Sequence, residues 1–139
     1  MTNSFFLNPF PELLTFAIVA PALIRIAIGI FFINFGWDKL TKEREHKLTF
    51  FESIGLKPAG VYVTLLGILQ IVIGISLIVG IFTQIAAIVA ATILLVSFII
   101  KKRHPEMLFT PSSVYALLFV MAISLLLTGA GIPAIDLPL

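Results

Sequence analysis

Two polar side chains stand inside long apolar runs of the sequence, where such groups are costly. Arg25 lies near the middle of the run at 13–36, and Gln70 lies near the middle of the run at 59–80. An arginine at the centre of a membrane helix costs about 2.5–3.5 kcal/mol on insertion scales, so it requires a partner or a water-filled cavity. We therefore expect Arg25 and Gln70 to lie at the same depth and to bond, directly or through one water. Because glutamine is neutral, we also expect a second acceptor near Arg25: Asp136, a backbone carbonyl or a ligand headgroup.

Helical spacing predicts which residues share a face with these two side chains. At 100° per residue, four residues fall on the face of Arg25: Gly29, Phe32, Gly36 and Lys39. Glycines at 67 and 74 fall on the face of Gln70. Small residues let helix backbones approach closely in a membrane, so these faces are expected to meet. The site is then either a structural lock between helices or a place where an anion, a proton or a quinone binds.

Several other chemistries are excluded by residue counts. The chain contains no cysteine, which excludes disulfides, thiolate zinc sites and iron–sulfur clusters. Its two histidines, His46 and His104, both lie in charged segments and cannot form a bis-histidine haem site within the membrane. We therefore predict no metal site and no covalently bound cofactor.

The composition is that of an integral membrane protein. Of the 139 residues, 60% are hydrophobic and 12% are charged, against about 45–50% and about 25% in soluble domains. A membrane helix needs roughly 20 residues. The sequence therefore predicts an all-α fold: one domain over residues 1–139, built as a four-helix transmembrane bundle. Its predicted spans are 13–36, 59–80, 82–100 and 112–131, with a tight turn at residues 80–83 between the second and third.

The basic residues predict how these helices are oriented. Eight of the nine lysines and arginines lie in the loops at 37–58 and 101–111, on one side of a four-span bundle. By the positive-inside rule, both loops face the cytoplasm and both termini face outward. We read the basic residues as topology signals and not as a nucleic-acid surface. Within the first loop, residues 41–54 predict a short helix on the cytoplasmic face. Leu40, Leu48, Phe51 and Ile54 fall on one side of it and form an apolar arc. Arg44 and Lys47 fall on the same arc, so the amphipathic pattern is weak.

The order of these features resembles the DoxX/DoxD family of small four-helix membrane proteins. The resemblance covers residues 25–136. It rests on Arg25 and Gly29, on the segments 35–40 and 69–74, on 77–83, and on a closing Gly129-Ala130-Gly131 followed by Asp136. Where the family usually has an acidic residue, this chain has Gln70, so the self-neutralising pair that the family pattern implies is absent. Four residues match positions that the resemblance marks as a ligand-binding or structural polar site: Arg25, Lys39, Gln70 and Asp136.

The resemblance implies a role in membrane redox chemistry. Some members of the family resemble the membrane subunit of thiosulfate:quinone oxidoreductase. A quinone is then the expected redox partner, and other membrane protein subunits and the lipid bilayer of the plasma (inner) membrane are the expected surroundings. Two alternatives stay open: a non-catalytic accessory or scaffold subunit of a respiratory complex, and a small anion transporter built around Arg25.

Overall fold

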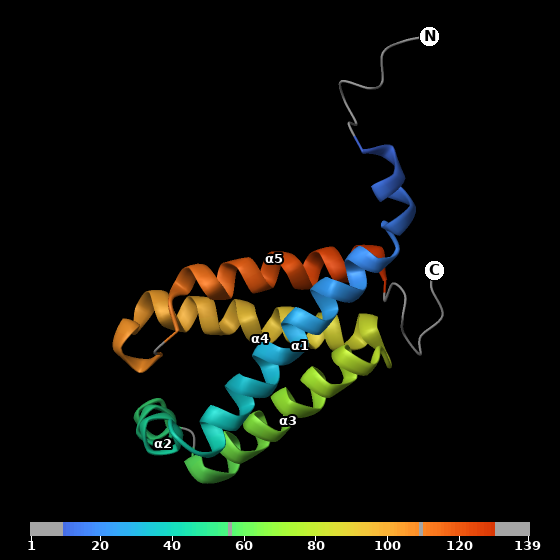
Figure 1. Ribbon diagram of the computed structural model, residues 1–139. Coiled ribbons are helices and arrows are strands. Elements are labelled where there is room, and N and C mark those ends of the chain that lie inside the picture. The colour runs from blue at the N-terminus through green and yellow to red at the C-terminus, as the bar shows by residue number, and fades with distance from the viewer. Residues whose placement is uncertain (1–9, 56, 109, 130–139) are drawn as a thin grey trace.

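The computed structural model describes residues 10–55, 57–108 and 110–129, and the regular structure within them is entirely helical (Figure 1). This confirms the predicted all-α fold. The five α-helices are α1 (Val19–Leu40), α2 (Arg44–Ser53), α3 (Ala59–Val79), α4 (Thr83–Arg103) and α5 (Ser112–Thr128). Two short 3₁₀ helices, η2 (Pro11–Phe16) and η3 (Pro105–Met107), precede α1 and follow α4.

Three of the helices, α1, α3 and α4, are long and apolar enough to cross a membrane. The fourth apolar helix, α5, has 17 residues, which gives a length of about 26 Å. That is the lower end of the range of about 17–25 residues for membrane helices. The described residues thus include three to four apolar helices that are long enough to span a membrane.

The first helix begins later than the sequence predicts. Instead of one span over 13–36, the chain forms η2 and then α1, which starts at Val19 and continues to Leu40. Pro21 explains the shift, because proline has no N–H to donate to the carbonyl four residues before it and is tolerated only in the first turn of a helix. Arg25 therefore lies in the second turn of α1 and not at its centre.

The four long helices form two antiparallel pairs that cross each other (Figure 1). One pair is α1 with α3, and the other is α4 with α5. The core between them contains Ile28, Phe32, Leu77, Leu118 and Leu125, none of which is more than 2% exposed. Four small residues of α4 are also buried: Ala86, Ala87, Ala90 and Ala91.

The two pairs are joined by the predicted tight turn between α3 and α4. Gly80 ends α3 with φ of 83°, a left-handed conformation that glycine adopts without strain. From this turn α3 and α4 diverge, and α2 lies at the far end of the molecule, where they are furthest apart (Figure 1). The helix predicted over 41–54 is therefore present as α2.

Candidate functional site

Two pairs of glycines fix the register of α1 against α3. An ideal Cβ atom built on Gly29 would lie 2.7 Å from the carbonyl oxygen of Gly74, and one built on Gly36 would lie 2.5 Å from that of Gly67. Gly29 thus faces Gly74, and Gly36 faces Gly67. The two glycines of each helix are seven residues apart, and because the helices are antiparallel the pairs follow in opposite chain order. The predicted meeting of the two glycine faces is confirmed.

This register separates the two polar residues that the sequence places together. It sets Arg25 level with Ile78, near the end of α3, and Gln70 level with Ile33. About 12 Å of helix lies between these two levels at 1.5 Å per residue. Both side chains are buried, at 1% and 2% exposure. However, Gln70 Oε1 accepts no hydrogen bond from the residues that the structure describes. The prediction of a direct Arg25–Gln70 bond to this oxygen is therefore wrong, and the bond through one water stays a prediction.

The error follows from the late start of α1. A first span over 13–36 would put Arg25 at the midpoint, opposite Gln70. Because α1 begins at Val19, its midpoint falls near Gly29 instead. The fourth candidate, Asp136, lies outside the described residues, so its predicted role stays a prediction.

The register predicts that a carboxylate at position 70 destabilises the bundle. In Gln70→Glu, the carboxylate would enter the apolar layer near Phe32 and Ile33 instead of pairing with Arg25. We expect a loss of about 1–3 kcal/mol in the free energy of unfolding, and no loss in Gln70→Leu, which removes the unsatisfied oxygen. SDS titration in mixed micelles, followed by circular dichroism, measures both. A Gln70→Glu protein more stable than the wild type would contradict the register.

A cavity of about 210 Å³ lies where α2 meets α1, α3 and α4, and we call it the lysine cavity. Its two charged lining residues are Lys39, at the end of α1, and Lys47, on α2. The remaining wall is mostly apolar and is formed by Phe50, Phe51, Leu66, Ile93, Val96, Ile100 and Leu108, with Thr92 and Ser97 as the hydroxyl-bearing members.

Two wall residues of the lysine cavity, Thr92 and Val96, are also exposed on the outer face of α4. Val96 lines it and is also half exposed on the outer face of α4. Thr92 also lines it, and its hydroxyl donates to the Ile88 carbonyl of its own helix at 2.9 Å. That outer face is apolar, because Ile88, Leu95 and Ile99 are exposed on it beside Val96, so a hydrophobic ligand can approach the cavity from this side.

Lys47 is the most deeply buried charged group of α2. It is 3% exposed, and its Nζ lies 3.8 Å from Oε2 of Glu43, one turn earlier. Burial penalises the charged form and lowers the pKa of Lys47. The nearby charge of Glu43 opposes that shift, and the charge of Lys101 adds to it.

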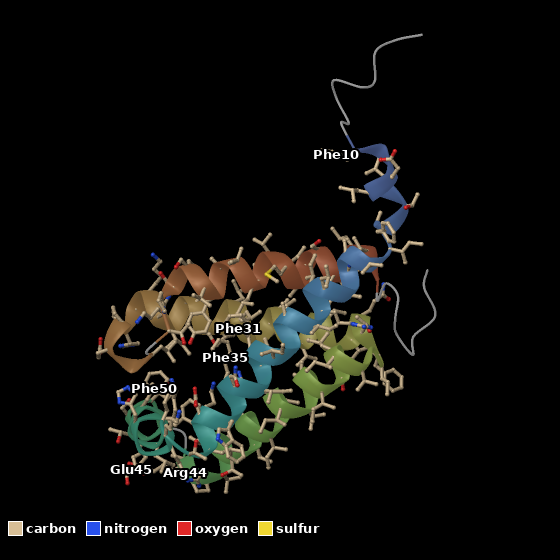
Figure 2. All side chains as sticks on the ribbon, viewed as in Figure 1. Phe10, Phe31, Phe35, Arg44, Glu45 and Phe50 are labelled. Carbon is tan, nitrogen blue, oxygen red and sulfur yellow. The ribbon has the colours of Figure 1, made fainter. Side chains whose placement is uncertain are left out.

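Contacts on both sides hold α2 over the cavity. Arg44 Nη1 donates a hydrogen bond to Thr64 Oγ1 of α3 at 2.9 Å, and His46 Nε2 lies 3.1 Å from the carbonyl oxygen of Glu106 in η3. The ring of Phe50 packs on that of His104 with centroids 6.0 Å apart. Figure 2 shows Phe50 on the side of α2 that faces α4, with Glu45 on the opposite side.

Sequence reasoning identified Lys39 but missed Lys47 and the cavity. The sequence contained a signal, because Lys47 falls on the apolar arc of residues 41–54. A lysine on an apolar arc indicates weak amphipathicity when read from the sequence alone. In the structure, the same position marks a lysine that is buried in the protein. In the described part of the chain, no group of three or more His, Cys, Asp or Glu side chains gathers as a metal site.

A bundle of helices that are long and apolar enough to cross a membrane is typical of a small integral membrane protein. Residues 20–103, more than half of the chain, match the family profile described as DoxX. The chain therefore belongs to the DoxX family. Comparison with curated proteins and with solved structures found no match.

Proposed function

We propose that this DoxX protein is a membrane subunit of an oxidoreductase and that it binds the head of a quinone in the lysine cavity. The observation that carries the proposal is the chemistry of the cavity: a mostly apolar wall that reaches the outer face of α4 at Val96, and two lysine side chains. A quinone head is a flat apolar ring with two carbonyl oxygens, and lysine ammonium groups are donors to such oxygens.

The size of the cavity supports this assignment. An engineered cavity of about 150 Å³ accepts a benzene ring, so about 210 Å³ has room for a substituted six-membered ring. The isoprenoid tail of a quinone would leave beside Val96 into the lipid. The electrons would come from a partner protein, such as one that oxidises a sulfur compound.

The accessory-subunit alternative has lost part of its support. It rests on the absence of cofactor ligands in the sequence and on small-residue faces available for packing against other subunits, and the second of these is weakened. Those faces are used inside this molecule: the alanines of α4 are buried in the bundle, and the glycines at 29, 36, 67 and 74 join α1 to α3. We therefore favour the quinone-binding role.

Equilibrium binding tests the proposal. The probe is tritiated decylubiquinone, and the protein is held in phosphatidylcholine nanodiscs, with empty nanodiscs measured in parallel. We expect saturable binding that approaches one quinone per chain. Uptake that does not saturate and equals that of empty nanodiscs would contradict the proposal.

We further propose that the α2 side of the molecule faces the cytoplasm of a plasma (inner) membrane. The chain has no native cysteine, so single cysteines can be placed freely. Cysteines at Glu52 and Glu106 should react with a membrane-impermeant maleimide only from the cytoplasmic side, and a cysteine at Phe82 only from the outside. All three positions are at exposed ends of helices or in 3₁₀ turns. Labelling of all three from one side would refute this topology.

A further inference from the structure

We propose that Lys47 donates the protons for reduction of a quinone held in the lysine cavity, and that Glu43 reloads Lys47 from the aqueous side of α2. This inference rests on the proposed function and adds to it a proton donor and a route. It starts from geometry: one buried charged side chain lies between the cavity and a partly exposed carboxylate.

The two ends of this route differ in their access to water. Lys47 lines the cavity, and its side chain is 4% exposed. Glu43, on the turn that leads into α2, is 23% exposed, with its Oε2 at 3.8 Å from Lys47 Nζ. That distance is longer than a hydrogen bond, but one intervening water or a small side-chain rotation closes it. Protons can thus reach the cavity while the quinone stays away from bulk water.

The chemistry balances with the partner as electron donor. A quinone accepts two electrons and two protons, and each carbonyl becomes a hydroxyl. The ammonium of Lys47 releases a proton to the nearer quinone oxygen and becomes an amine. Glu43, protonated from water, passes its proton to that amine. The reloaded ammonium releases the second proton to the other quinone oxygen once the ring has turned that oxygen toward Nζ, so each carbonyl gains one proton and one electron.

The charges around Lys47 suit a proton donor. Three charged groups lie near Lys47: Glu43 at the start of α2, Lys39 at the end of α1 and Lys101 near the end of α4. Burial is the largest cause of the lowered Lys47 pKa, and a lysine with a lowered pKa is a stronger acid nearer the working pH. Because the protonated form is the donor, quinone reduction should slow as the pH rises through the pKa of folded Lys47, which lies below 10.5.

Stopped-flow reduction tests the route without the natural partner. Dithionite supplies electrons to decylubiquinone bound to the full chain in phosphatidylcholine nanodiscs, and quinone absorbance is followed over a pH series. Lys47→Met should slow reduction at neutral pH by at least about tenfold and remove the fall in rate at high pH. Glu43→Gln should slow it by a smaller factor. Lys47→Arg keeps the charge but releases no proton, so it should bind quinone and still reduce slowly.

Matched controls come from the same segment. Lys42 and Glu45 are both exposed, so Lys42→Met and Glu45→Gln should leave the rate and its pH profile unchanged. Wild-type rates in Lys47→Arg or Glu43→Gln with quinone bound would overturn the proton route while leaving the proposed function intact. A wild-type rate in a Lys47→Met protein that binds quinone would likewise overturn the proton route alone. A wild-type protein that binds no quinone would overturn both proposals.

Discussion

Placing a methyl group at Gly74 should separate α1 from α3 and destabilise the bundle. A Cβ atom there would lie 2.6 Å from the carbonyl oxygen of Gly29 and 2.7 Å from Cγ1 of Ile33. The Gly29 carbonyl is part of the helix backbone and cannot move aside as the end of a flexible side chain can, so the helices must move apart. Overpacking of this kind costs about 1–3 kcal/mol, and we expect Gly74→Ala to lower the free energy of unfolding by that amount in SDS titration.

Gly60→Ala is the matched control on the same helix. Gly60 faces α2, and the nearest atoms to an added Cβ, Arg44 Nη2 and Leu48 Cδ2, are at ordinary contact distances of 3.7 Å. Alanine is also the better helix former, so this change should be neutral or slightly stabilising. Equal losses in Gly60→Ala and Gly74→Ala would contradict the packing.

A double-mutant cycle tests the register itself. Gly29→Ala and Gly74→Ala disturb one contact, so once the helices have moved apart at that point the second change should add little. Gly36→Ala acts about 10 Å further along α1 and should combine with Gly74→Ala more nearly additively. Additive losses for Gly29 with Gly74 would show that the two residues do not oppose each other.

Filling the lysine cavity should abolish quinone binding. Leu66 lines the cavity from α3, and the larger indole ring in Leu66→Trp would occupy the space assigned to the quinone head. We expect the affinity for decylubiquinone to fall by at least about 30-fold, which corresponds to about 2 kcal/mol. The measurement is the same nanodisc binding assay.

Leu69→Trp provides the control for this experiment. Leu69 is on the same helix but is 43% exposed toward the surroundings of the bundle, so tryptophan there should leave the affinity unchanged. If Leu66→Trp unfolds the bundle, Ile93→Phe is the variant to measure in its place, because it narrows the cavity from α4. Wild-type affinity in a folded Leu66→Trp protein would place the quinone elsewhere.

The helices and their small-residue contacts could be predicted from the sequence because they depend on local patterns. A run of apolar residues, the turn at Gly80 and the repeated glycines each act within a few residues of chain. Those features predicted the all-α fold and the approach of α1 to α3, and the spacing of apolar residues within 41–54 predicted the short α2. The presence of α2 is notable in this respect, because its amphipathic pattern is weak.

The site could not be predicted to the same extent because it depends on where elements start and dock. Moving the start of α1 to Val19 changes the level of Arg25 and separates it from Gln70. The lysine cavity exists only because α2 folds back over the diverging ends of α3 and α4. No local pattern encodes that docking, so Lys47 looked like an interruption of an apolar arc, although Lys39 was identified.

The most direct test of the central claim is photoaffinity labelling of the wild-type protein in nanodiscs with an azido-substituted ubiquinone, followed by mass spectrometry of the labelled peptides. A quinone head in the lysine cavity should label residues of its wall, chiefly Phe50 on α2, Leu66 on α3 and Val96 on α4, and excess decylubiquinone should suppress the labelling. Suppressible labelling concentrated instead around Arg25, or labelling that excess quinone does not suppress, would contradict the account.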